Sequence, residues 1–327
     1  MNSSKFCSNK ASRFAAMIAI VTCIASNQSE AQTSPSSENL SKTSAVADHF
    51  QVGSLHVELR GNFSAKSVPI ILIPGLSSGP YVWDDTVKQL QADHALYLVT
   101  LAGFNGKPAL QGQGPMIEKA KQSLLEMITR KQIVKPILVG HSLGATLSTW
   151  FAQEHSDLIR GVFAVDGLPV FPHTENIPTE QRSQMAQGMR AQMASASQET
   201  FAAQQLQYMQ TMGVIDQALA KTLAARSATS DRIAVAEYMG ELLGMDIRKN
   251  LGAIKVPFAI VSPYYAPDMA AHKITEQDKA AYYGALLKGT PQLEVISINE
   301  ARHFPMLDQP TIFAEKLQIF LQSLSKQ

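Results

Sequence analysis

The fold is decided by the stretch Pro136 to Ala152, PILVGHSLGATLSTWFA, in which a G-x-S-x-G pattern joins a short apolar run to an amphipathic segment. The apolar run predicts a buried strand and the later segment a helix. A serine on a sharp turn between them has a strained backbone, so the positions two before and two after must lack large side chains. Gly140 and Gly144 meet this need. The pattern predicts Ser142 as a nucleophile; the simpler alternative is a helix N-cap after a glycine turn.

The rest of the chain alternates strand-like and helix-like segments around this stretch. Strands are expected at 50–60 (with a turn at Gly53-Ser54), 68–73, 95–100, 135–139, 161–165, 256–261 and 296–298, and helices at 81–92, 116–130, 143–154 and 311–324. This alternation predicts an α/β fold with a doubly wound, mostly parallel sheet. Functional residues of such sheets lie beyond the carboxyl ends of the strands, and Ser142 is expected at such an end.

Composition fits one large hydrophobic core. The 327 residues are 45% hydrophobic and 17% charged, with a formal net charge of +1. Since no basic block stands out, we expect no nucleic-acid partner. The sequence has no His, Cys, Asp or Glu cluster with metal-ligand spacing, and Gly112-Gln113-Gly114 is too little for a phosphate loop. We therefore expect no metal and no cofactor.

The first residues predict a processing segment. Three basic residues precede the apolar run Phe14 to Ala25, and Ser29-Glu30-Ala31 offers a cleavage site. The run is shorter than the roughly 20 residues of a membrane-spanning helix. We expect residues 1–31 to be a signal peptide, the protein to be exported to the periplasm or secreted, and no stable membrane span after processing; an uncleaved anchor is the alternative. Residues 32–47, rich in small polar residues, predict a disordered lead-in.

An insertion interrupts the alternating pattern at about residues 171–250. Its composition turns to Gln, Ala and Met with several helical periods. We expect residues 48–170 and 251–327 to form the core, and the insertion to form a helical cap, or lid, between the sixth and seventh strands.

Methionines recur at helical spacing in this insertion. The usual interpretation of such a stripe is core packing. The alternative is that the flexible side chains of Met185, Met189 and Met209 line an adaptable apolar pocket above Ser142. That pocket would favour apolar acyl or ring-containing substrates.

Four parts of the chain together resemble the α/β-hydrolase family, over roughly residues 48 to 325. They are the turn around Ser142, Ile73-Pro74-Gly75-Leu76, Leu101-Ala102-Gly103-Phe104 and the late His303. The resemblance implies the order serine, acid, histidine for the catalytic groups. Dehalogenases and epoxide hydrolases of this fold carry an aspartate where this chain has Ser142, so the serine implies a different branch.

The resemblance implies that His303, after the last expected strand, is the base that takes the serine proton. A carboxylate would then orient the imidazole and stabilise its charged form. We predict Asp268, after the strand at 256–261, in this role. Asp166 in Val165-Asp166-Gly167 is the alternative acid, although Asp-Gly also suits a turn.

The backbone N–H groups of Leu76 and Leu143 are expected to form the oxyanion hole. Pro74 stands where the family often has a histidine, which puts the hydrogen bonding of that loop in question. His141, although next to the serine, is expected to be a packing or hydrogen-bonding residue.

The resemblance thus implies a serine hydrolase that cleaves carboxylic esters through a Ser-His-Asp triad and an acyl-enzyme intermediate, and the expected signal peptide predicts that it is exported. Its expected partner is a small-molecule substrate, an ester with an apolar acyl or ring-containing group. Amidases, aminopeptidases, acyltransferases and C–C hydrolases share this fold and remain alternatives. A non-catalytic module that binds a ligand in the same pocket is a further alternative.

Overall fold

A computed structural model describes residues 49–64, 67–111 and 114–325. The expected signal peptide at 1–31 and the lead-in at 32–47 lie outside these residues. Within the described part of the chain, no helix combines the length and apolar character that crossing a membrane requires.

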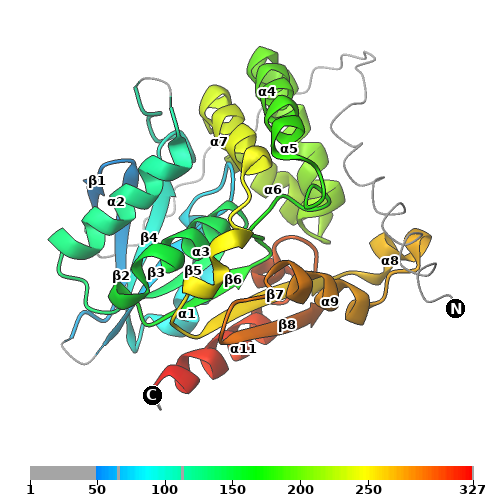
Figure 1. Ribbon diagram of the computed structural model, residues 1–327. Helices are drawn as coiled ribbons and strands as arrows, with labels where there is room; N and C mark the ends of the chain where they lie inside the picture. Colours follow the sequence, from blue (N-terminus) through cyan, green and yellow to red (C-terminus); the bar gives the residue numbers. More distant parts are fainter. Residues whose placement is uncertain (1–48, 65–66, 112–113, 326–327) are drawn as a thin grey trace, which may run out of the picture. The chain divides into compact units, whose positions relative to one another are not determined.

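One eight-stranded sheet organises the molecule, in the strand order β1-β2-β4-β3-β5-β6-β7-β8 (Figure 1). The strands are β1 (His49–Val52), β2 (Leu55–Gly61), β3 (Val68–Ile73), β4 (His94–Leu101), β5 (Ile137–His141), β6 (Gly161–Val165), β7 (Phe258–Tyr264) and β8 (Leu293–Asn299). β1 and β2 pair antiparallel, as do β2 and β4. All the other pairs are parallel. The expected α/β fold with a mostly parallel sheet is confirmed.

The α-helices connect and cover these strands. They are α1 (Asp84–Leu90), α2 (Met116–Arg130), α3 (Leu143–His155), α4 (Thr179–Ser195), α5 (Gln198–Tyr208), α6 (Gln217–Ser227), α7 (Arg232–Gly244), α8 (Ala266–Met269), α9 (Glu276–Leu286), α10 (Pro305–Asp308) and α11 (Pro310–Leu324). Short 3-10 turns lie at Pro80–Trp83, Ser156–Leu158, Arg248–Ala253 and Ala270–His272, and a π-helical turn lies at Met209–Gly213.

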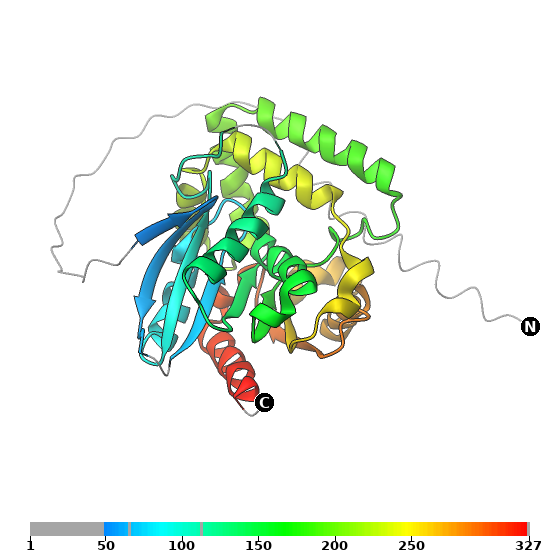
Figure 2. The same cartoon turned by 60° about the vertical axis from the view of Figure 1, so that its left-hand side comes forward.

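The sheet has a buried core on each face. Along β3, Ile71 and Ile73 belong to one core and Ile70 and Leu72 to the other, because side chains alternate between the faces of a strand. Helices α2, α3 and α9 contribute to the first core, and α1 and α11 to the second. Figure 2 shows helices on both sides of the twisted sheet. Since both faces are covered, the central strands β3, β5, β6 and β7 are largely buried and mostly apolar.

Most expected elements are present, with shifted ends. The strand expected at 135–139 lies at Ile137–His141, so it runs directly into the turn at Ser142. The short strand expected at 296–298 is longer, at Leu293–Asn299. Asp268, expected in a loop, lies in the single helical turn α8.

The segment between β6 and β7 contains α4, α5, the π-helical turn, α6 and α7, which we call the insertion. In Figures 1 and 2, α4 and α7 lie side by side at one end of the sheet.

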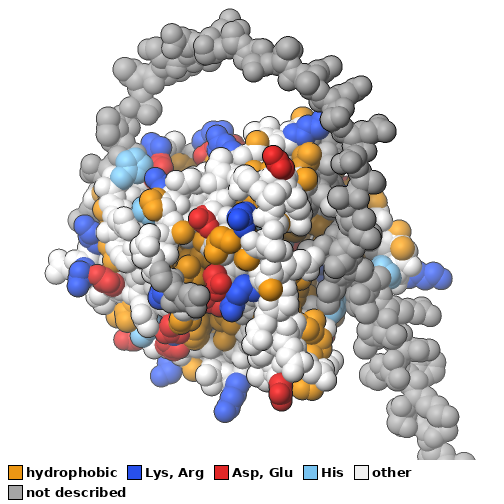
Figure 3. Space-filling view, turned by 90° about the horizontal axis from the view of Figure 1, so that it is seen from above, with side chains coloured by type: hydrophobic (Ala, Val, Ile, Leu, Met, Phe, Trp, Pro, Cys, Tyr) orange, Lys and Arg blue, Asp and Glu red, His pale blue; other side chains and the backbone are white. Residues whose placement is uncertain are grey.

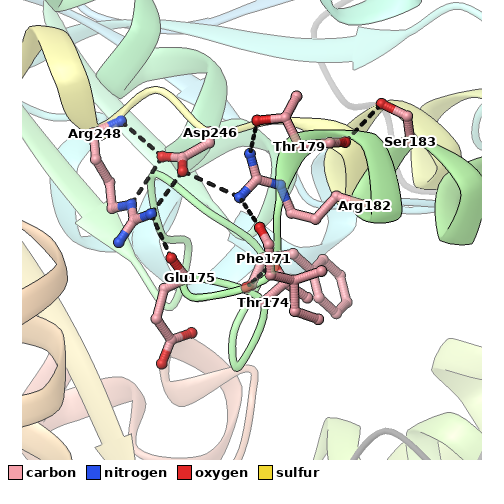
Figure 4. Close-up of polar contacts among 9 residues, drawn as sticks. Phe171, Thr174, Glu175, Thr179, Arg182, Ser183, Asp246 and Arg248 are labelled. Atoms are coloured by element: carbon pink, nitrogen blue, oxygen red, sulfur yellow. Dashed lines mark hydrogen bonds and ion pairs between the residues drawn. The ribbon is translucent and has the colours of Figure 1, made fainter.

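One carboxylate ties together the two connections of the insertion to the sheet (Figure 4). Asp246 accepts hydrogen bonds from Arg182 Nη1 at 3.3 Å and from Arg248 Nε at 2.8 Å. Arg248 Nη2 also donates to the backbone oxygen of Glu175 at 2.7 Å. Because Glu175 precedes α4 and Asp246 follows α7, these bonds join the start of the insertion to its end.

Candidate active site

Ser142 occupies the sharp turn between β5 and α3, with φ 52° and ψ −116°. A Cβ at Gly140 would lie 2.3 Å from the carbonyl oxygen of Gly144, and one at Gly144 would lie 2.2 Å from that of Ile73. Contacts this short with backbone atoms leave no space for a side chain at either position. The two glycines therefore allow the strained turn that presents the serine.

The turn after β3 lies against Ser142. A Cβ on Gly75 would be 3.0 Å from the Ser142 Cβ, so the residue that follows, Leu76, lies close to the serine. Leu143 begins α3, where a backbone N–H has no acceptor within the helix. The structure thus brings both expected oxyanion donors to the neighbourhood of Ser142.

The insertion contacts this same turn. Ser77 Oγ donates to the backbone oxygen of Ser227 at 2.9 Å, and Ser230 Oγ donates to the backbone oxygen of Ser77 at 3.4 Å. Ser227 ends α6 and Ser230 follows it. The insertion therefore helps to hold the loop that carries Leu76.

His303 contacts Asp166, with 2.6 Å between Nδ1 and Oδ2. Asp166 directly follows β6 and has a positive φ of 46°. Burial raises the pKa of this carboxyl. The charge and hydrogen bond of His303, the charge of Lys279 and the hydrogen bond of Tyr283 together outweigh burial, so that the pKa is about 2. Asp166 is therefore ionised at neutral pH and faces the imidazole.

Asp268, our predicted acid, makes a different contact and needs correction. Its carboxylate forms a bidentate ion pair with Arg302, at 2.8 Å from Nε and 2.8 Å from Nη2. The carboxylate that the structure places on His303 is Asp166, the alternative. The physical reason is competition: Arg302 adjoins His303 in the chain and occupies both oxygens of Asp268.

His141 is fully buried beneath this site. Its Nε2 lies 2.8 Å from the backbone oxygen of His303, and the two rings are 4.5 Å apart between centroids. Burial, followed by the charge of His303, lowers the pKa of His141 well below its usual value. A neutral ring must donate from Nε2 to reach a carbonyl oxygen. The expected role of His141 in packing and hydrogen bonding agrees with these contacts.

The insertion also holds the loop of His303, through the π-helical turn Met209–Gly213. The backbone N–H of His303 donates to Met212 O at 3.1 Å. Arg302 Nη1 donates to Gln210 O at 2.8 Å and to Val214 O at 3.1 Å. The backbone N–H of His303 and the guanidinium of Arg302 therefore attach the loop after β8 to the insertion.

Sequence reasoning missed two residues of this site. Tyr283 donates from its hydroxyl to Asp166 Oδ1, although 117 residues separate the two in the chain. Arg302 was overlooked although it directly precedes His303. No sequence spacing indicates the contact of Tyr283 with Asp166. The position of Arg302 next to His303, in contrast, indicates that a carboxylate near His303 can form an ion pair with the arginine instead of the histidine.

The methionines expected above Ser142 differ in their surroundings. Met209 is buried among core side chains, with 2% exposure, while Met185 and Met189 are half-buried on α4. Tyr208 of the insertion lies next to the expected base. Its ring centroid is 6.0 Å from that of His303, edge to face, and the residue is 39% exposed. Figure 3, which looks down on the insertion, shows hydrophobic side chains gathered in the middle of this face among charged ones.

The described residues contain no cluster of three or more His, Cys, Asp or Glu side chains able to hold a metal ion. A buried carboxylate, Asp166, contacts the imidazole of His303, and the turn that carries Leu76 lies against a serine with a strained backbone. These groups are of the kinds that proton transfer uses.

Comparison with known proteins finds curated relatives that match part of the chain. The chain is 30% identical over 108 residues to the pimeloyl-[acyl-carrier protein] methyl ester esterase of Vibrio atlanticus (strain LGP32), which is 33% of this chain and 40% of that protein. The chain thus spans less than half the length of this curated relative.

Solved structures match nearly the whole fold. A hydrolase from Pseudomonas aeruginosa PA01 matches with a TM-score of 0.67 and 16% identity, over 85% of this chain and 99% of that one. A thermophilic esterase from Thermogutta terrifontis matches with a TM-score of 0.66 and 16% identity, over 85% and 99%. At these identities the likeness concerns the fold.

The family profile described as the alpha/beta hydrolase family matches residues 70–316, which include the turn at Ser142, Asp166 and His303. The chain belongs to the alpha/beta hydrolase family.

Proposed function

We propose that the protein is a serine hydrolase that cleaves carboxylic esters through an acyl-enzyme intermediate. Ser142 is the nucleophile, His303 the base and Asp166 the acid. The observation that carries this proposal is the contact of 2.6 Å between His303 Nδ1 and Asp166 Oδ2, in a chain whose Ser142 has the strained φ of 52° at the turn after β5.

In the first step, the Ser142 hydroxyl attacks the ester carbonyl while His303 Nε2 accepts its proton. Asp166 keeps the Nδ1–H tautomer in place and stabilises the imidazolium. The negative charge on the former carbonyl oxygen would be bound by the N–H groups of Leu76 and Leu143, at about 3 kcal/mol per donor. The imidazolium then gives its proton to the departing alcohol.

In the second step, His303 takes a proton from water as the water oxygen attacks the acyl carbon. The bond from that carbon to Ser142 Oγ then breaks, the imidazolium returns the proton to Oγ, and the carboxylic acid is released. Both steps need the same groups, so no other side chain has to carry the proton. Ester cleavage is favoured over the alternatives by the esterase relatives, one of which acts on a methyl ester by its name. The exposed hydrophobic side chains of the insertion support an apolar acyl group.

The experiment is a comparison of p-nitrophenyl esters of increasing acyl length with aminoacyl p-nitroanilides, using the wild type and Ser142→Ala. We expect hydrolysis of the esters alone, lost in Ser142→Ala. Faster cleavage of the anilides would favour an amidase or aminopeptidase. A well-folded wild type that cleaves neither and is not labelled by a fluorophosphonate would favour a non-catalytic binding module.

We also propose that the protein is exported to the periplasm or secreted, after cleavage near Ala31. The support is the basic segment followed by the apolar run Phe14 to Ala25. Cell fractionation with intact-mass measurement tests this: a product that begins near residue 32 outside the cytoplasm is expected, and a full-length cytoplasmic product would refute it.

A further inference from the structure

Asp166 has a second hydrogen-bond partner besides His303. Its Oδ2 faces His303 Nδ1 at 2.6 Å, and its Oδ1 accepts a hydrogen bond from the Tyr283 hydroxyl. Each oxygen of the carboxylate thus has one donor, and the two donors come from different elements, the loop after β8 and helix α9.

Tyr283 is a well-fixed donor. It is only 5% exposed, and burial, followed by the charge of Asp166, raises its pKa well above the usual value. The phenol therefore keeps its proton at neutral pH and can only donate toward a carboxylate. Its ring lies 6.3 Å from that of Tyr282, at 71°, which limits its orientation.

The position of Asp166 makes such support useful. An acid directly after β6 stands on a strained residue, with φ 46°, and its backbone N–H donates to Val261 O of the next strand at 3.1 Å. A carboxylate held by one bond to His303 alone could rotate about its side-chain torsions. A second bond to the other oxygen fixes both its position and its plane.

We propose that Tyr283 is a positioning residue for Asp166, acting through the acid on His303. This rests on the proposed function, because it assigns Tyr283 a part in the same triad. Besides holding the carboxylate, the phenol withdraws negative charge from it, and so moderates the attraction between Asp166 and His303. Two consequences follow: loss of the hydroxyl should lower kcat, and it should make the imidazole more basic.

Other ionisable groups surround Asp166, and replacing Tyr283 by phenylalanine leaves all of them in the protein. Lys279 of α9 lies with Nζ 5.9 Å from the Tyr283 ring and acts electrostatically on Asp166, as does His303. His141 of β5 and Tyr208 of α5 are also within electrostatic reach of the carboxylate. None of these groups bonds to Asp166 Oδ1 in the described part of the chain, so the effect of removing the phenol can be assigned to that one bond.

Adjacent tyrosines provide a matched control. Tyr282 is also partly buried on α9, but its hydroxyl donates to Glu175 Oε2 at 3.2 Å rather than to Asp166. Tyr283→Phe and Tyr282→Phe therefore remove the same atom from neighbouring residues. The measurements are kcat and KM for a p-nitrophenyl ester from pH 5 to 9, and the downfield proton NMR signal of the His303 Nδ1–H.

In Tyr283→Phe we expect kcat to fall by about tenfold or more, the effect of losing one hydrogen bond to a charged group, with KM nearly unchanged. The acidic limb of kcat/KM should move to higher pH and the NMR signal should shift. Tyr282→Phe should match the wild type in all of these. Equal limbs and equal signals in the two variants, or an equal loss of kcat in both, would overturn the proposal.

A fluorinated tyrosine at position 283 retains the hydroxyl and the fold but makes it a stronger donor. It should move the acidic limb to lower pH, opposite to Tyr283→Phe, and a shift in the same direction would also overturn the proposal. If the wild type cleaves no ester, the proposed function fails, yet the NMR comparison still decides whether Tyr283 acts on the pair of Asp166 and His303.

Discussion

Replacing Asp166 or Asp268 by asparagine separates the two candidate acids, because each carboxylate has a different partner. Asp166 lies 2.6 Å from His303 Nδ1, whereas Asp268 is bound at both oxygens by Arg302. In Asp166→Asn, the side-chain amide can present its N–H to Nδ1 and so favour the wrong imidazole tautomer. We expect kcat to fall by about 10⁴-fold, the loss that a triad aspartate-to-asparagine change produces.

The same change has a stability effect that the structure allows us to size. Burial raises the pKa of Asp166, but His303, with Lys279 and Tyr283, outweighs burial and lowers the pKa from an ordinary value of 3.8 to about 2. That difference corresponds to about 2 kcal/mol in favour of the folded state at neutral pH. Since the pKa is lowered on folding, this contribution is complete above about pH 4 and disappears as the pH falls toward 2.

Asp268→Asn loses charge from an ion pair outside the contact with the imidazole. We expect kcat to stay within about tenfold of the wild type, since the hydrogen bond to His303 is untouched. The assay is p-nitrophenyl ester hydrolysis at pH 7.5, with folding checked by circular dichroism and unfolding measured in urea. A loss of several orders of magnitude in Asp268→Asn, with near-normal turnover in Asp166→Asn, would refute the reasoning.

Three further predictions concern stability. Gly144→Ala should lower the free energy of unfolding in urea by more than about 2 kcal/mol, since its Cβ would lie 2.2 Å from a strand carbonyl oxygen. Gly188→Ala, where a Cβ would meet no described atom within 4 Å, should raise it by up to about 1 kcal/mol, and equal effects would contradict the geometry. Burial, followed by the charge of His303, lowers the pKa of His141, so the folded state disfavours its protonation. The free energy of unfolding should therefore be unaffected by His141 above about pH 6.5, and should fall below that pH by up to about 1.4 kcal/mol per pH unit. His141→Gln should flatten that slope; an unchanged slope from pH 5 to 6.5 would show that another group titrates. Arg302→Met should cost about 2 kcal/mol, and less in an Asp268→Asn background, where only its bonds to the carbonyl oxygens of Gln210 and Val214 remain to be lost; strictly additive losses in this double-mutant cycle would rule out the ion pair.

The sequence predicted the strands and the turn at Ser142 because these features depend mostly on residues that are close together in the chain. The apolar runs of the strands and the glycines around Ser142 depend on contacts a few residues apart, apart from the approach of Gly144 to Ile73. The end of β5 moved by two residues because tertiary pairing with β3 and β6 sets the strand limits.

The acid could not be chosen from the sequence, because its partner is 137 residues away. Chain order allowed both Asp166 and Asp268. The decision depends on which carboxylate Arg302 captures and on the hydroxyl of Tyr283, and both are set only when β6, β7, α9 and the His303 loop pack together. Long-range side-chain contacts of this kind leave no periodic signal.

The insertion was expected to be helical, but its bond to the His303 loop was not foreseen. That bond depends on a π-helical turn at Met209–Gly213, whose carbonyl oxygens accept from His303 and Arg302. Such turns often occur at functional sites. Nothing in the run of methionines and glutamines distinguishes a π-helical turn from an ordinary helix.

The central claim is that Ser142 is an activated nucleophile, and covalent labelling tests it most directly. Wild-type protein and Ser142→Ala are incubated with a fluorophosphonate at pH 7.5, and the adduct is located by intact mass and peptide mapping. We predict one adduct per chain, on Ser142, formed about 10³-fold or more slowly in Asp166→Asn, and absent in Ser142→Ala. Well-folded wild-type protein that takes up no label, or takes it up equally in Ser142→Ala, would contradict the account.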